Sequence, residues 1–146
     1  MPAVERSIVI NVPADRVWEA FVNLGDWPVW KRHMREVHLL TEVPLAMNSR
    51  ARIVLKSGLS STCEVTEFSP GRSFTWDGRL LGSNLSFAHM VQPANSGSRV
   101  VLRIEASGPT ALVASPALRP SYSRMLNCSL RRLKASLEAA PVSPRA

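Results

Sequence analysis

The sequence predicts an α+β protein in which a curled antiparallel sheet packs around one long C-terminal helix. One observation is a stripe of leucines at steps of four, three and four within residues 121–139, which is the spacing of one helix face. Another is a series of turn residues roughly every eight to twelve positions between residues 50 and 107, typical of an antiparallel meander. Each strand between those turns has one apolar face, so the sheet needs a partner that the helix is long enough to provide. The leucines of the stripe are Leu126, Leu130, Leu133 and Leu137.

The N-terminal part of the chain predicts a strand followed by short helices. Residues 5–12 alternate, with isoleucines recurring on what would be the inner face of a strand. Pro13 stops strand pairing and suits the first turn of a helix, which Gly25 ends. Residues 26–30 are too few for more than one further helical turn.

Six further strands are expected in the middle of the chain, separated by turns rich in glycine, proline, serine and asparagine. Their apolar residues recur at every second position, as in a sheet with one buried face. After them, residues 110–119 are expected to form an interrupted helix, because Pro116 and Pro120 lack the amide donor that a helix needs. The expected strands are residues 37–43, 50–57, 59–68, 72–80, 85–91 and 100–106.

Length and composition are those of one globular domain. The 146 residues are 45% hydrophobic and 20% charged, and we expect one domain over residues 1–140 with a flexible tail at 141–146. No signal-peptide pattern is evident and no apolar run approaches the ~20 residues of a membrane span, so a cytoplasmic location is expected. Cys63 and Cys128 lie in apolar segments and are expected to be unpaired thiols.

The net charge of +7 has two interpretations. The 18 lysines and arginines are scattered singly or in pairs, and no aromatic residues interleave with them as base stacking would require. A solubilising surface is therefore favoured and no nucleic acid partner is expected, while peripheral contact with an anionic membrane stays open. The sequence does not determine the oligomeric state.

The sequence contains no signature of a metal or cofactor site. His33 and His38 do not converge by any local geometry, and no Cys-x-x-Cys, P-loop, dinucleotide-binding or Gly-x-Ser-x-Gly motif is present. We therefore expect neither a metal nor a cofactor.

Five motifs follow one another along nearly the whole chain. They are residues 8–18 (IVINVPADRVW), 26–30 (DWPVW), 67–76 (EFSPGRSFTW), 97–100 (GSRV) and the leucine-striped final helix. In order and spacing they resemble the START-like helix-grip superfamily (SRPBCC type), in particular its polyketide cyclase/dehydrase and lipid-transport branch. The resemblance implies a seven-stranded antiparallel sheet wrapped around the long C-terminal helix, with two short helices after the first strand.

The resemblance also implies a deep apolar cavity between sheet and helix. Our first hypothesis is that this cavity binds a hydrophobic small molecule such as a lipid, a sterol or an aromatic polyketide. The alternative is an aromatase/cyclase-type or dehydrase-type enzyme acting on a polyketide-like substrate. Whether the protein is an enzyme stays open, because fold alone does not decide activity.

Candidate site residues follow from strand parity. His89 shares a face with Phe87 and Val91, so it would lie on the cavity wall and is the catalytic candidate. It could act as a general base or orient a ligand carbonyl. The plainer interpretation, which is favoured, is a core histidine hydrogen-bonded to backbone or water. Trp27 and Trp30 could stack on a flat ligand at the cavity mouth, or plug the corner beside the short helices, which is favoured. The expected cavity residues are Trp27, Trp30, Ile53, Leu55, Phe74, Trp76, Phe87, His89, Leu102, Met125 and Leu126.

Overall fold

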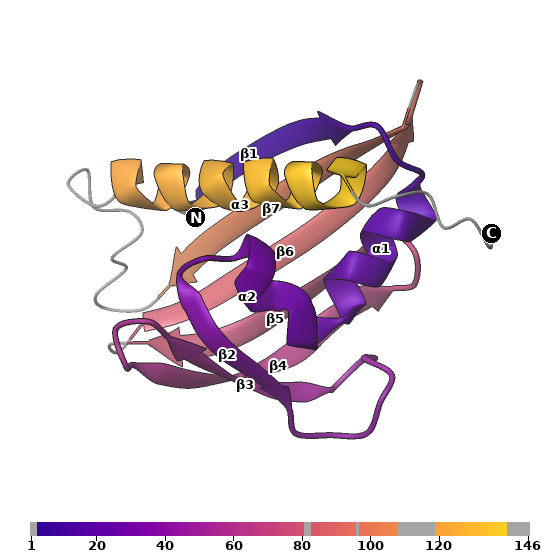
Figure 1. Ribbon diagram of the computed structural model, residues 1–146. Coiled ribbons are helices and arrows are strands. Elements are labelled where there is room, and N and C mark those ends of the chain that lie inside the picture. Colours follow the sequence, from indigo (N-terminus) through magenta and orange to yellow (C-terminus); the bar gives the residue numbers. More distant parts are fainter. Residues whose placement is uncertain (1–2, 81–82, 96, 108–118, 140–146) are drawn as a thin grey trace.

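The computed structural model describes residues 3–80, 83–95, 97–107 and 119–139 (Figure 1). Its strands are β1 (Ala3–Ile10), β2 (Met34–Leu39), β3 (Arg50–Leu55), β4 (Ser60–Ser69), β5 (Ser73–Leu80), β6 (Ser83–Ala94) and β7 (Gly97–Ser107). Its helices are α1 (Ala14–Val22), the single 3₁₀ turn η1 (Leu24–Asp26), α2 (Trp27–Trp30) and α3 (Arg119–Ala139). The predicted α+β class is confirmed.

The strands form a single seven-stranded sheet in the order β1-β7-β6-β5-β4-β3-β2, antiparallel throughout. Strands β2 to β7 form a meander, and β1 pairs with the last of them. The register places Phe74 opposite His89 and His89 opposite Leu102, so these three side chains form one row across the sheet. The strand parity derived from the sequence is correct in this row, and all three side chains are buried.

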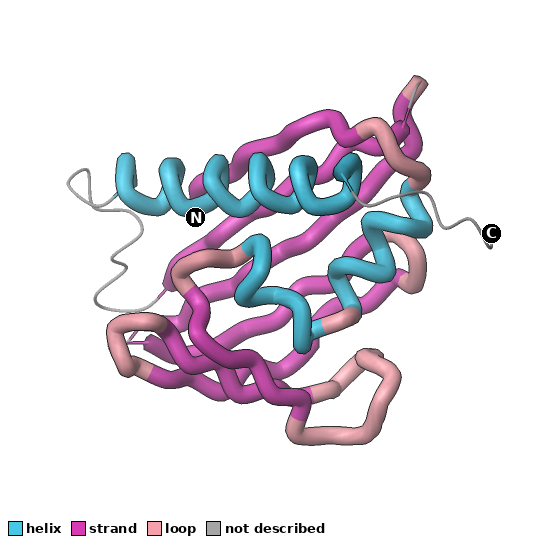
Figure 2. Tube along the Cα trace, viewed as in Figure 1, coloured by secondary structure: helices cyan, strands magenta, loops and turns pink. Residues whose placement is uncertain are grey.

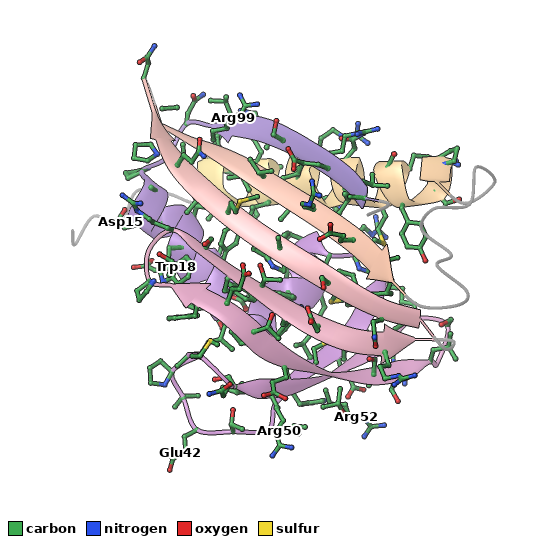
Figure 3. All side chains as sticks on the ribbon, turned by 180° about the vertical axis from the view of Figure 1, so that it is seen from behind. Asp15, Trp18, Glu42, Arg50, Arg52 and Arg99 are labelled. Atoms are coloured by element: carbon green, nitrogen blue, oxygen red, sulfur yellow. The ribbon has the colours of Figure 1, made fainter. Side chains whose placement is uncertain are left out.

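The leucine stripe attaches α3 to the sheet. Leu126, Leu130 and Leu133 are buried and Leu137 is partly buried against the same core. The helix packs against β1, β7 and α2. Figures 1 and 2 show α3 lying across one face of the curled sheet, with α1 and α2 beside it on that face. Viewed from behind, the opposite face is covered by no helix of the described ranges (Figure 3).

The short helices follow from local sequence. Pro13 has an extended backbone, and its carbonyl accepts hydrogen bonds from the amides of Arg16 and Val17 in the first turn of α1. This helix buries Val17 and Phe21. The indole Nε1 of Trp27 donates to the carbonyl of Phe21 at 3.1 Å, which ties α2 to the end of α1. This corner brings Trp27 against Phe74 and Trp76 of β5, and Trp30 packs on Trp27.

One expected strand has different bounds in the structure, and two expected segments fall largely outside the described residues. The second strand was expected at residues 37–43, but β2 covers Met34–Leu39 because its start pairs with Leu55 through a bulge, and a loop follows it. The interrupted helix expected at residues 110–119 lies outside the described residues except for Arg119, which begins α3, and the tail at 141–146 also lies outside them. The division into a domain and a tail stays a prediction.

Candidate ligand-binding site

An apolar cavity of about 180 Å³ lies between the inner faces of β3 to β6 and the first turns of α3. Its walls are almost entirely carbon and sulfur. The hydroxyl of Ser61 donates to the carbonyl of Arg79 at 2.8 Å, so its proton is already used. Tyr122 contributes a phenol whose pKa is raised by burial, so it stays neutral. The lining residues are His33, Met34, Ile53, Leu55, Ser61, Cys63, Gly78, Leu85, Phe87, Tyr122 and Met125.

Residue size along β5 explains why this part of the interior is hollow. The inward positions run Phe74, Trp76, Gly78, so two large rings are followed by a residue with no side chain. Gly78 pairs with Cys63 on one side and Leu85 on the other, both of which line the cavity. A Cβ at Gly78 would lie 2.7 Å from the sulfur of Cys63, so the glycine also makes room for that thiol.

The other end of the interior is filled by a cluster of aromatic rings around His89. The imidazole of His89 stacks on Phe74 with ring centroids 4.5 Å apart, and it lies 5.0 Å from the ring of Trp27. Only 1% of His89 is exposed. The cluster consists of Phe21, Trp27, Trp30, Phe74, Trp76 and His89.

Lys31, which directly follows α2, places its amine inside this cluster. The Nζ atom lies 2.9 Å from Nε2 of His89 and 4.2 Å from the ring centroid of Trp27. The residue is only 6% exposed, and no carboxylate of the described residues forms an ion pair with it. Burial lowers the pKa of Lys31 from 10.5 to about 7. The amine is therefore poised between its charged and neutral forms near neutral pH.

His89 is the acceptor for that amine. Burial, and then the charge of Lys31, lower the pKa of His89 well below its usual value, so the ring is neutral and Nζ donates to Nε2. Backbone groups of Phe74 and Phe87 beside the ring oppose this shift, but none completes a hydrogen bond to Nδ1. Nδ1 thus has no hydrogen-bond partner in the described part of the chain, which leaves a buried polar atom to be satisfied.

The titratable groups on the cavity wall are also neutral near pH 7. Burial raises the pKa of the Cys63 thiol to about 11. Burial, with the nearby charge of Lys31, lowers the pKa of His33 to about 3. Neither group therefore carries charge into the cavity, and the wall suits an uncharged part of a ligand.

The structure distributes the expected cavity residues over three places. Ile53, Leu55, Phe87 and Met125 line the cavity. Leu102 and Leu126 are buried in the hydrophobic core and do not line the cavity. The remaining five lie in the aromatic cluster, away from the cavity wall, and their ligand-binding roles stay predictions. These five are Trp27, Trp30, Phe74, Trp76 and His89.

Burial decides between the two interpretations of the α2 tryptophans. Trp27 is fully buried and Trp30 is 2% exposed, so both plug the corner and neither forms an open mouth. Strand parity predicts that a side chain faces the interior, but it does not predict whether other side chains fill the interior around it. This is the reason that inward-facing His89 lies within packed rings and not on the cavity wall.

The sequence analysis missed Lys31. It stands between Trp30 and Arg32 in a segment too short for helical periodicity, so nothing in the pattern separates it from an exposed lysine. Gly78 was also missed, although a glycine inside a strand pattern is a known sign of close backbone or side-chain approach. Gly78 lines the cavity, and Lys31 lies in the aromatic cluster.

The fold and site together define a class of protein, in which a curled antiparallel sheet closes on a C-terminal helix and leaves an apolar cavity between them. The chain belongs to the polyketide cyclase / dehydrase and lipid transport family, whose sequence model matches residues 1–138. The resemblance inferred from the motifs is thereby confirmed. No curated protein matches the sequence significantly.

Solved structures share the fold at low sequence identity. DR_A0006 from Deinococcus radiodurans is 22% identical with a TM-score of 0.67, over 95% of this chain and 98% of that one. TTHA0849 from Thermus thermophilus is 15% identical with a TM-score of 0.75, over 97% and 100%. The di-domain ARO/CYC StfQ from the steffimycin biosynthetic pathway is 17% identical with a TM-score of 0.75, over 94% of this chain and 51% of that one.

The described residues contain neither a membrane-spanning helix nor a cluster of metal-binding side chains. Among their helices, none has both the length and the apolar character to cross a bilayer. No group of three or more histidine, cysteine or acidic side chains in the described ranges is arranged to hold a metal ion.

Proposed function

We propose that this protein binds a hydrophobic small molecule in the cavity between its sheet and α3. The observation that carries the proposal is the cavity itself, about 180 Å³ with walls that are apolar and neutral. Ligand sites are typically apolar hollows with a few polar groups, and here the Tyr122 phenol is such a group. Membership of a family whose description includes lipid transport supports the same function.

The volume limits which ligands fit. A cavity of roughly 150 Å³ accommodates one benzene molecule, whereas drug-sized ligands need about 300 Å³ or more. At about 180 Å³, the cavity suits a single ring or a short alkyl chain as it stands. A sterol or a fused polycyclic molecule would need the sheet and α3 to move apart.

The geometry favours binding over catalysis. Lys31 and His89 are a titratable pair suited to proton transfer, but neither lines the cavity in the described structure. A ligand that fills the cavity would touch the Cys63 thiol, whose pKa of about 11 leaves it protonated and unreactive. A cyclase or dehydrase activity that uses His89 stays a prediction.

A cytoplasmic location is part of the proposal. Cys63 and Cys128 are both unpaired thiols, as was expected from the sequence. Free thiols in a small protein are typical of a reducing compartment, which supports this placement.

The substitution Leu55→Trp tests the cavity directly. Leu55 is half-buried in the cavity wall, and the indole ring of tryptophan, which is larger than the leucine side chain, will fill part of the cavity. The affinity for octan-1-ol, measured by isothermal titration calorimetry, will therefore fall at least tenfold. Lys56→Trp is the matched control, because Lys56 is exposed and the same ring there will leave affinity unchanged. Equal affinities in the two variants would contradict the proposed location. Failure of the wild-type protein to bind octan-1-ol or other small hydrophobic molecules more tightly than about millimolar would contradict the function itself.

A further inference from the structure

A surface cleft of about 410 Å³ adjoins the apolar cavity. The two spaces share His33 and Met125 as lining residues, so they meet at these two side chains. The cleft runs along the first half of α3 and beside the segment that follows α2. Its lining residues are Arg32, His33, Ser121, Arg124, Met125, Cys128, Ser129 and Arg131.

The charge of this cleft is of one sign. Arg32, Arg124 and Arg131 are exposed, and no carboxylate is among the described lining residues. None of the three arginines forms an ion pair with a carboxylate of the described ranges. Ser121 also lies in the first turn of α3, where the helix dipole adds positive potential.

Three other surface hollows in the described part of the chain each contain a single arginine. In the hollow beside the β4–β5 turn and β6 that arginine is Arg72, with no carboxylate among the described lining residues. The groove on the outer face of the sheet is lined by three carboxylates and a single arginine, and the hollow between α1 and the end of α3 combines one arginine with two carboxylates. The net charge of +7 is therefore not spread evenly over the hollows. Three arginines gather, without a carboxylate among the described lining residues, at the cleft that adjoins the apolar cavity.

We propose that the ligand is an anionic amphiphile, with its apolar part in the cavity and a carboxylate or phosphate group held by Arg32, Arg124 and Arg131 in the adjoining cleft. This inference rests on the proposed function and specifies its ligand class. Guanidinium groups suit both anions, because their paired donors match carboxylate and phosphate oxygens. Because the cavity wall is neutral, the charged group of the ligand would lie in the cleft and its hydrocarbon part in the cavity.

Four probes with the same eight-carbon chain test this assignment: octanoate, octyl phosphate, octan-1-ol and octylammonium. Titration calorimetry at about pH 8 and about 20 mM salt will show both anions binding at least tenfold more tightly than octan-1-ol. Octylammonium will bind more weakly than the alcohol. Raising the salt to about 500 mM will reduce the preference for anions, because exposed charges are screened. The ratio of octanoate to octyl phosphate affinity indicates which anion the cleft prefers.

Two triple variants with equal charge changes complete the test. The variant Arg32→Gln, Arg124→Gln, Arg131→Gln will lose the preference for anions and keep its affinity for octan-1-ol. The matched control substitutes glutamine for Arg50, Arg52 and Arg99, which are exposed at other parts of the surface (Figure 3), and it will keep the preference. Arg50, Arg52 and Arg99 line neither the cavity nor the cleft.

The outcomes separate this inference from the function on which it rests. Equal binding of octanoate and octan-1-ol to the wild-type protein would overturn the inference and leave hydrophobic ligand binding intact. A preference that survives in the cleft variant, or disappears equally in both variants, would also overturn it. Failure of all four probes to bind would contradict the proposed function, and the inference with it.

Discussion

Substitution of Lys31 by methionine is expected to stabilise the protein by roughly 2–4 kcal/mol at pH 7. Burial lowers the pKa of this lysine from 10.5 to about 7, a shift equivalent to roughly 4–5 kcal/mol against the charged form. Methionine fills a similar volume without an amine to desolvate, and it retains contact with the neighbouring tryptophans. Urea denaturation will measure the change in the free energy of unfolding.

The same substitution will alter how stability depends on pH. Between pH 7 and pH 10.5 the unfolded chain holds a proton on Lys31 that the folded protein has released, so the free energy of unfolding rises with pH in this window. Below pH 7 the lysine is protonated in both states and contributes no further slope. The wild-type protein will therefore gain stability from about pH 7 to pH 9 relative to Lys31→Met.

Lys56→Met is the matched control, because Lys56 is exposed and its substitution will change stability by less than about 0.5 kcal/mol. A Lys31→Met variant that is less stable than the wild type, or that shows the same pH dependence, would contradict the buried-amine interpretation. A side chain that lowers stability and has a strongly shifted pKa is a candidate functional residue. If Lys31→Met still binds ligand, Lys31 is not required for ligand binding in the cavity.

Gly97→Ala is expected to destabilise the protein by about 3 kcal/mol or more. A Cβ at this first residue of β7 would overlap the carbonyl oxygen of Ile10 and lie 2.9 Å from Cα of Asn11. Both contacts are with backbone, which no side-chain rotation relieves. The neighbouring Ser98 hydroxyl donates to the carbonyl of Val12 at 2.6 Å, so separating the strands would also break a buried hydrogen bond.

Gly25→Ala serves as the control for this prediction. Its Cβ would approach only the side-chain oxygen of Asn23 at 3.7 Å, an ordinary contact, so stability will change by less than about 1 kcal/mol. Thermal and urea denaturation of the two variants give the comparison. A Gly97→Ala protein as stable as Gly25→Ala would show that the end of β1 and the start of β7 are not packed as described.

The architecture was predictable because it depends on local repeats. Alternation in β3 and β7 and the leucine stripe of α3 each identify a buried face without reference to the rest of the chain. The bounds of strand β2 were predicted less accurately, because it is an edge strand with a bulge near its start. Its pairing depends on β3 and not on its own periodicity.

The site was less predictable because a cavity depends on what is missing from the interior. Ile53 and Phe87 line it, whereas Phe74 and Trp76 face the same way and are fully packed. The difference arises from Gly78 and from the tryptophans that α2 inserts at the other end. Lys31 occupies the packed end, and its burial arises from the turn after α2 and not from any sequence pattern.

Methyl NMR of methionine-labelled protein tests ligand occupancy of the cavity most directly. Met34 and Met125 line the cavity, whereas Met47 is exposed and Met90 lies among the surface grooves of the sheet. On addition of octanoate, nuclear Overhauser effects from the alkyl chain will reach the methyl groups of Met34 and Met125 and will not reach those of Met47 or Met90. Contacts confined to Met47 or Met90, or none with any of these methyl groups at saturating octanoate, would contradict binding between the sheet and α3.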